Sequence, residues 1–189
     1  MLGVRIIIRK TTKEILAESF VELAETRTID KISIIDIVEN CSLTKPTFYR
    51  YFKDKYDLIQ WIYAQNVEKI FIRIGKNGYI FKNSLLDNLH YFESNRKFMV
   101  NILKHTSGRD SFLNLINEID IRFITEIIRK ESGYVKLPED VIAMIRVYCY
   151  GKGQYLSDWL LDCKPVSCEK MAEYMEACIP DILRLYLCE

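Results

Sequence analysis

Long hydrophobic runs are missing from this sequence of 189 residues. No segment approaches the roughly 20 apolar residues that cross a bilayer, and the apolar start from Val4 to Ile8 is interrupted by Arg5. We therefore expect no signal peptide, no membrane span and no membrane partner. We expect the protein to be cytoplasmic.

Cysteine and histidine are present without the spacing of a metal site. The sequence has six cysteines but no Cys-x-x-Cys, and its two histidines do not form a nearby pair. We therefore expect no metal site, no disulfide scaffold and no cofactor. Scattered cysteines are typical of small buried hydrophobic residues, and a thiol switch between Cys163 and Cys168 is the alternative.

The motifs of common enzymes are absent as well. There is no Gly-rich phosphate loop, no His-Glu-x-x-His and no Gly-x-Ser-x-Gly. We therefore expect a protein that is not an enzyme. With 49% hydrophobic residues, the chain is long enough for one or two small domains with a substantial core.

The net charge of +1 hides an uneven distribution of charge. Residues 1–13 contain four basic residues and no acid, and residues 42–56 contain four basic residues and one acid. Residues 14–41, between them, contain seven acids and two basic residues. This sorting favours a protein that touches phosphate along one edge, although ordinary solvated helix faces are the alternative.

Apolar residues recur at helical spacing over almost the whole chain, which predicts an all-α fold. The first helix is expected from Thr11 to Glu25. A short second helix begins near Ser33, an N-cap residue followed three positions later by Asp36, which suits the positive end of a helix. Its apolar residues, among them Ile37, recur at intervals of three and four and form a face to be buried.

A tight turn then leads to another short helix, capped by Thr44 and with Pro46 in its first turn, where a missing amide costs little. Phe48 and Phe52, four residues apart, form its buried side. The groups left exposed are cationic heads, a hydroxyl and phenols, which suit phosphate oxygens and base edges. This helix-turn-helix pattern predicts double-stranded DNA as a partner. The alternative is a helical bundle that merely carries a lysine-rich surface.

The segment from Thr44 to Lys55, TKPTFYRYFKDK, resembles the signature of TetR-family transcriptional regulators. The resemblance implies that Lys45, Pro46 and Thr47 face base edges, with the proline ring on a thymine methyl. It implies that Tyr49, Arg50, Tyr51 and Lys55 hold phosphates. The candidate DNA-binding residues are Ser33, Thr44, Lys45, Pro46, Thr47, Tyr49, Arg50, Tyr51 and Lys55.

Two positions depart from the family pattern. Ser42 stands where the family usually has a turn glycine, so we expect a left-handed serine that costs on the order of 1 kcal/mol. Ile35 stands where many relatives carry a polar or basic base reader, so we expect fewer base contacts from this helix.

The expected organisation is a three-helix helix-turn-helix DNA-binding domain over residues 1–54 and a larger helical effector-binding and dimerisation domain over residues 55–189. Glycines and an asparagine predict a turn at residues 75–78. Helices of the larger domain are expected at Lys55 to Ile74, Ser84 to Ser94, Arg96 to His105, Arg109 to Ser132, Pro138 to Asp162 and Ser167 to Leu187, the last kinked at Pro180.

The resemblance implies a homodimer that pairs through the last two long helices. Gly151 and Gly153 support pairing, because a glycine inside a helix costs about 1 kcal/mol unless something approaches closely there. A symmetric dimer places two recognition helices roughly 34 Å apart and requires a palindromic operator. The apolar residues that can form either this interface or the core of one subunit are Ile142, Ile145, Tyr148, Tyr155, Trp159, Met171, Met175, Ile179, Ile182 and Tyr186.

The effector, a small molecule or a protein, is not identified by the sequence. The larger half also resembles a subgroup of the family that includes a coactivator of dihydroxyacetone kinase genes, which responds through a partner protein. We therefore expect a TetR-type regulator, most readily a repressor, and the alternative is a coactivator or adaptor controlled by a protein partner. The residues that can line an effector cavity, or equally belong to the core, are Trp61, Tyr63, His90, Tyr91, Phe98, Met99, His105, Tyr148 and Trp159.

Overall fold

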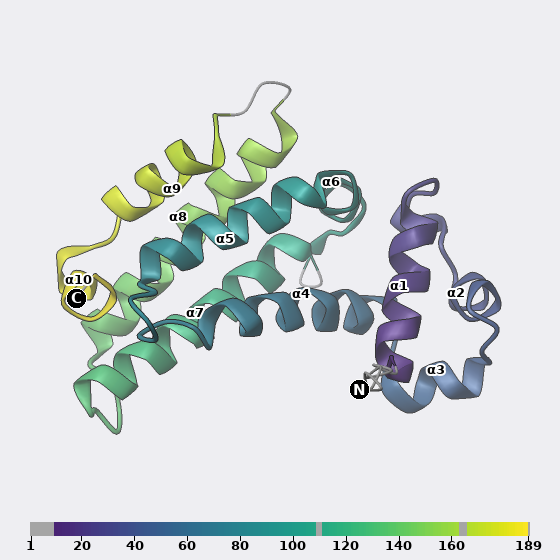
Figure 1. The fold of residues 1–189 in the computed structure, drawn as a ribbon, viewed down its shortest axis with the longest axis horizontal. Coiled ribbons are helices and arrows are strands. Elements are labelled where there is room, and N and C mark those ends of the chain that lie inside the picture. Colours follow the sequence, from purple (N-terminus) through teal and green to yellow (C-terminus); the bar gives the residue numbers. More distant parts are fainter. Residues whose placement is uncertain (1–9, 109–110, 163–165, 189) are drawn as a thin grey trace, which may run out of the picture. The chain divides into compact units, whose positions relative to one another are not determined.

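A computed structural model describes residues 10–108, 111–162 and 166–188, which form helices joined by turns, with no β-strand in these ranges (Figure 1). The predicted all-α fold is confirmed. The chain divides into two compact units, Met1–Ile62 and Tyr63–Glu189. This division falls inside a helix, whereas the predicted boundary after residue 54 lies at the start of that helix.

The N-terminal unit contains α1 (Thr12–Ala24), a 3₁₀ turn (Ile29–Lys31), α2 (Ile34–Asn40), α3 (Lys45–Tyr51) and the start of α4 (Lys55–Phe71). α1 begins where the sequence predicts, because the Glu14 carboxylate accepts from the Thr11 amide at 2.7 Å and Thr11 Oγ1 accepts from the Glu14 amide at 3.3 Å. The core of this unit consists of side chains at most 3% exposed: Leu16, Phe20, Ile29, Ile32, Ile37, Phe48, Phe52 and Leu58.

The C-terminal unit contains the rest of α4 together with α5 (Phe81–Ser94), α6 (Arg96–His105), α7 (Phe112–Ser132), α8 (Glu139–Leu161), α9 (Cys168–Ala177) and α10 (Asp181–Leu187). α7 packs along α8, α5 packs along α9, and α10 packs against α7 and α8 (Figure 1). Among the described helices, none combines the length and the apolar character of a membrane span.

At Pro180 the last predicted helix is interrupted, whereas the sequence predicts only a kink there. α9 ends at Ala177 and α10 begins at Asp181, so the expected single helix is two helices. Pro180 is the N-cap residue of α10, with φ −57° and ψ 142°, and it has no amide to continue the ladder of α9. The other helices agree with the predictions to within a few residues, although Arg109, the predicted start of α7, lies outside the described residues.

The turn predicted at residues 75–78 is confirmed, since Gly75, Asn77 and Gly78 all have positive φ angles. The presence of a glycine at position 153 of α8 is explained by a contact within the chain. A Cβ atom at Gly153 would overlap the side-chain oxygen of Asn117 on α7, so Gly153 allows the two helices to approach closely. Because this contact is intramolecular, Gly153 gives no support to pairing.

Most of the apolar residues considered for pairing belong to the core of this unit. Ile145, Tyr148, Trp159, Met171, Met175 and Ile179 are at most 5% exposed. Tyr155 is different, because it is 41% exposed on α8. Other large apolar residues exposed on α8, namely Met144, Val147 and Tyr150, are ones that the periodicity does not single out.

Candidate nucleic-acid interface

A reciprocal cap fixes the N-terminus of α2. Ser33 Oγ accepts from the Asp36 amide at 3.2 Å, and the Asp36 carboxylate accepts from the Ser33 amide at 2.8 Å. The Ser33 hydroxyl also donates to Asp36, and Arg27 Nη1 donates to the second carboxylate oxygen at 2.8 Å. The bonds from the Ser33 side chain and backbone, with that from Arg27, lower the pKa of Asp36 to about 2. Ser33 is a predicted DNA contact, and in this structure its hydroxyl makes the hydrogen bonds of the cap.

The turn between α2 and α3 has the strain that the sequence predicts. The Leu43 amide donates to the Val38 carbonyl at 2.8 Å and closes the turn. Ser42 has a φ of 56°, in the left-handed region that costs a residue with a Cβ about 1–2 kcal/mol. Ile35 on α2 is 44% exposed and adds no polar group to this side of the motif.

Two phenylalanines set the rotation of α3. Phe48 is fully buried, and its ring centroid lies 5.8 Å from that of Phe52. At the start of the helix, Thr44 Oγ1 accepts from the Thr47 amide at 3.4 Å, and Pro46 lies in the first turn. Because Phe48 and Phe52 must face the core, the remaining circumference of α3 is left to solvent.

The exposed side of α3 carries most of the predicted base-edge and phosphate groups. Tyr49 is 57% exposed and Tyr51 is 36% exposed. Thr47 is partly buried, and its hydroxyl lies 2.9 Å from that of Thr44. The residues of this α3 surface are Lys45, Pro46, Tyr49, Arg50 and Tyr51. Two cationic heads and two phenols on a helix of seven residues suit contacts to phosphate and to base edges.

The ammonium of Lys55, a residue predicted to hold phosphate, has acceptors inside the N-terminal unit. Its ammonium donates to the backbone carbonyls of Ile29, Asp30 and Ile32 at 2.8, 3.1 and 3.0 Å. An ammonium has three N–H donors, so these bonds use all of them. Burial lowers the pKa of Lys55, against the opposing effect of the Asp30 carboxylate. Lys55 therefore ties the start of α4 to the 3₁₀ turn before α2, and the predicted phosphate contact is not supported.

Of the four basic residues near the N-terminus, the structure describes Lys10 and Lys13, and both have partners within the N-terminal unit. Arg5 and Arg9 lie outside the described residues. Lys10 pairs with Glu18 at 2.7 Å. Lys13 lies over the ring of Phe52, 5.4 Å from its centroid, and over the ring of Trp61, a predicted effector residue, at 5.7 Å.

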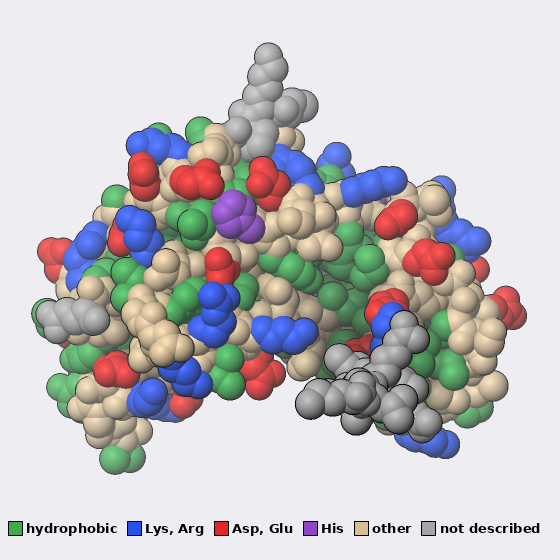
Figure 2. Space-filling model, viewed as in Figure 1, with side chains coloured by type: hydrophobic (Ala, Val, Ile, Leu, Met, Phe, Trp, Pro, Cys, Tyr) green, Lys and Arg blue, Asp and Glu red, His purple; other side chains and the backbone are tan. Residues whose placement is uncertain are grey.

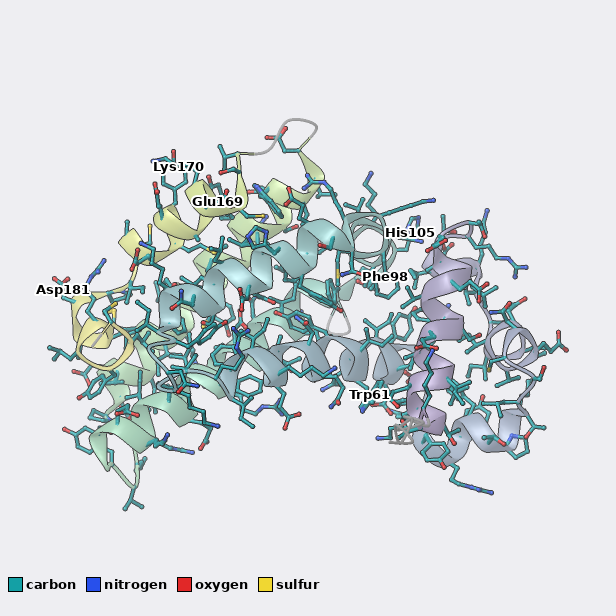
Figure 3. The ribbon with its side chains drawn as sticks, viewed as in Figure 1. Trp61, Phe98, His105, Glu169, Lys170 and Asp181 are labelled. Atoms are coloured by element: carbon teal, nitrogen blue, oxygen red, sulfur yellow. The ribbon has the colours of Figure 1, made fainter. Side chains whose placement is uncertain are left out.

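The nine residues predicted for an effector cavity are divided between the two units of the chain, with Trp61 in the first and the others in the second. Trp61 packs against Phe52 in the N-terminal unit, with ring centroids 5.9 Å apart. His105, labelled in Figure 3 with Phe98, lies on α6 with its Nδ1 2.9 Å from the Asn101 carbonyl oxygen. His90 is exposed on α5. The rest are partly or fully buried: Tyr63, Tyr91, Phe98, Met99, Tyr148 and Trp159.

A pocket of about 670 Å³ lies elsewhere in the C-terminal unit, and none of those nine residues lines it. Its walls come from the end of α4, the connection to α5, α7 and α10. Two of its lining residues, Phe71 and Phe123, stack with ring centroids 4.6 Å apart. The volume is in the range of small-molecule sites. The sequence gives no sign of this pocket, because the residues that line it come from four separate segments.

A group of side chains that can bind a metal ion is also not evident from the sequence. His90, Glu93 and Cys168 each place one donor atom within 4.8 Å of the others. The only local signal is the pair His90 and Glu93, three residues apart, because Cys168 follows Glu93 by 75 positions. Cys163, the predicted partner of Cys168 in a thiol switch, lies outside the described residues.

A helix-turn-helix unit with a cationic and phenolic surface, followed by a larger helical unit, defines a two-domain DNA-binding transcriptional regulator. Family models match both parts: the model for bacterial regulatory proteins of the tetR family over residues 15–62, and that for a transcriptional regulator C-terminal region over residues 80–181. The chain belongs to the TetR family, and the predicted family is confirmed.

Similar proteins include an operon regulator. Over 87 residues the chain is 30% identical to the HTH-type dhaKLM operon transcriptional activator DhaS of Lactococcus lactis, and the match spans 46% of each protein, about half the length of that relative. The solved structure of a dihydroxyacetone kinase operon activator DhaS superposes with a TM-score of 0.64 and 18% identity, over 93% of this chain and 97% of that one.

A TetR regulator from Streptococcus agalactiae 2603V superposes with a TM-score of 0.63 and 20% identity, over 88% of this chain and 92% of that one. Members of the family bind DNA and typically act as dimers, with a ligand or partner bound to the C-terminal domain. At these identities the superpositions show the fold, while the family models show the class of function.

Proposed function

We propose that this protein binds a palindromic DNA operator as a homodimer and represses the adjacent genes until an effector binds its C-terminal unit. The observation that carries the proposal is the α3 surface, which the burial of Phe48 and Phe52 turns toward solvent. Acting on DNA, the protein works in the cytoplasm, and its function includes no catalytic step.

The α3 residues divide by chemistry into two groups. Lys45, Pro46 and Thr47 read base edges from the first turn of α3. Tyr49, Arg50 and Tyr51 hold phosphates, and their exposure makes them accessible for these contacts. Ser33 and Thr44 contribute through the caps that fix α2 and α3, and Lys55 positions α4 through its three carbonyl partners.

A second copy of the chain is the partner proposed for the exposed face of α8. Met144, Val147 and Tyr150 are 40%, 65% and 53% exposed, and Tyr155 continues the face. Large apolar residues gathered on one exposed helix face mark an interaction surface. Gly151, on the same face, has no atom within 4 Å of the position of an added Cβ, which leaves room for a partner helix.

The effector is proposed to act in the C-terminal unit. The pocket of about 670 Å³ supports a small molecule there, since its size and its aromatic and charged lining suit such a ligand. Tyr79 lines the pocket, and its hydroxyl donates to Asp87 at 2.7 Å. A ligand that displaces this bond would act on the connection between α4 and α5.

A second candidate function is activation controlled by a protein partner. The similarity to the relative named as an operon activator favours it. The two functions differ in sign, so transcription in vitro from a promoter with its operator separates them. Addition of the protein lowers transcript from that promoter under the first proposal and raises it under the second.

Selection of bound fragments from the source genome tests the proposed function. We expect a short palindrome beside a gene, two chains bound to each site, and the mass of a dimer by light scattering of the free protein. The absence of any enriched sequence, at salt concentrations that still allow binding, would contradict an operator-binding regulator.

A further inference from the structure

We propose that His90, Glu93 and Cys168 form a zinc-binding site in the C-terminal unit. The three residues offer an imidazole nitrogen, a carboxylate oxygen and a thiolate sulfur from two helices. This proposal does not depend on the proposed operator or effector, because it concerns a different group of side chains.

The site is built by the packing of α5 along α9. His90 and Glu93 are three residues apart on α5, so their side chains share one face of that helix. Cys168 is the first residue of α9, and its Sγ lies 3.2 Å from Glu93 Oε2. One donor atom of each residue lies within 4.8 Å of the others. Tetrahedral zinc bonds of 2.0–2.3 Å hold ligand atoms roughly 3.5 Å apart, so a side-chain shift of about 1 Å closes the site.

The donor set favours zinc over the other common divalent cations. Magnesium and calcium prefer oxygen ligands alone, whereas a thiolate with an imidazole is typical of zinc. Glu169, labelled at the start of α9 in Figure 3, lies near the site, with its Oε1 3.8 Å from His90 Nε2, but the group of three donors leaves the fourth zinc position open. Water can fill the same position. The space-filling view shows a histidine at the surface with acidic side chains near it (Figure 2).

The charges around the site also suit a cation. Two carboxylates lie at the site, that of Glu93 beside Cys168 and that of Glu169 beside His90. Arg96 is a basic residue close enough to interact electrostatically with Cys168. The Arg96 guanidinium donates to the carbonyls of Trp159 and Asp162 at 2.7 and 2.9 Å, which holds it on those acceptors. Zinc binds cysteine as the thiolate, so binding releases the proton that the Cys168 thiol donates to Glu93.

Binding of zinc would link α9 to α5. The ion would replace the single thiol–carboxylate hydrogen bond with bonds to both helices, and it would bind the folded chain, where the three donors are close together, more tightly than the unfolded chain. Zinc therefore raises the temperature at which the C-terminal unit unfolds.

The test is a titration of the full, metal-free, reduced chain with Co²⁺, followed by competition with Zn²⁺. We expect one Co²⁺ per chain at this site, with the charge-transfer absorption of a thiolate ligand. Cys168→Ser should abolish that absorption, and His90→Gln should weaken zinc binding at least 10- to 100-fold, since even the loss of an outer-shell partner has that effect. Cys178→Ser is the matched control, because Cys178 is an exposed cysteine at the end of α9, and it should leave binding unchanged.

Absence of the charge-transfer absorption, or its persistence in Cys168→Ser, would overturn the proposal. Circular dichroism establishes that each variant is folded. If Cys168→Ser does not fold, His90→Gln decides the question, because the His90 side chain is 48% exposed and its replacement leaves the core intact. Zinc affinity equal to that of the parent in His90→Gln would then refute the site.

Discussion

The Lys152 ammonium lies 2.5 Å from the Asp120 carboxylate, and the two side chains are only 7% and 1% exposed. The pair joins α8 to α7 beside Gly153, a position where these helices approach closely. Burial by itself would lower the pKa of Lys152, but the neighbouring Asp120 carboxylate outweighs it and the pKa is raised. The packing of the two longest helices therefore includes a buried charge pair.

Lys152→Met should destabilise the C-terminal unit by about 3–5 kcal/mol, because it leaves the Asp120 carboxylate buried without its partner. Chemical denaturation followed by far-ultraviolet circular dichroism measures the loss. Lys170→Met is the matched control: it removes an exposed pair with Glu173 and should change stability by less than about 1 kcal/mol. Equal effects of the two changes would mean that the buried pair has no special structural role.

Gly153→Ala should destabilise the same unit by about 1–3 kcal/mol, even though alanine favours helices, because the new methyl group displaces Asn117. Gly151→Ala supplies the comparison at an open position of the same helix, and thermal unfolding of the two variants provides the measurement. If both variants were equally stable, the contact with Asn117 would not be what requires a glycine.

Lys55→Met should lower the stability of the N-terminal unit by about 1–3 kcal/mol, because three carbonyl oxygens lose a charged donor. The salt dependence of DNA binding should stay as in the parent. Arg50→Ala should leave stability unchanged, and it should reduce the salt slope of DNA binding by about 1. A smaller salt slope for Lys55→Met than for the parent would instead support the phosphate contact that the family resemblance implies for Lys55.

Asp36 should contribute stability that depends on pH. Its pKa falls from about 3.9 in an unfolded chain to about 2 in the folded protein. The contribution is therefore complete above about pH 5 and is lost as the pH falls toward about 2. The stability difference between the parent and Asp36→Asn, measured by denaturation over this range, should shrink toward low pH. A difference that is constant from pH 5 to pH 2 would show that ionisation of Asp36 does not support α2.

Local signals in the sequence are sufficient for the helices and for the α3 surface. Ser33 and Thr44 are the caps that the sequence predicts, and Thr11 caps the first helix at its predicted start, because a cap depends on neighbours within three residues. Partners from distant segments are not visible in the sequence. Lys55 finds its carbonyl acceptors 23 to 26 residues earlier, and Cys168 meets Glu93 across 75 residues. Only the packing of helices creates such contacts.

The sequence also leaves open which apolar residues face a partner. Ile145 and Met171 have the same helical spacing as an interface stripe, yet both are fully buried in their own unit. Val147 is 65% exposed two positions after Ile145. Periodicity identifies an apolar face, but the choice between the core of one chain and contact with another depends on where the neighbouring helices pack.

The central claim is that the α3 surface binds DNA, and operator affinity at several salt concentrations tests it most directly. Fluorescence anisotropy would compare the parent with Tyr49→Ala combined with Arg50→Ala, with Lys97→Ala on α6 as the charge control. We expect the double variant to bind every DNA sequence more weakly, with a salt slope reduced by about 1, while Lys97→Ala matches the parent. A double variant that binds the operator as tightly as the parent, with the same salt slope, would contradict the account.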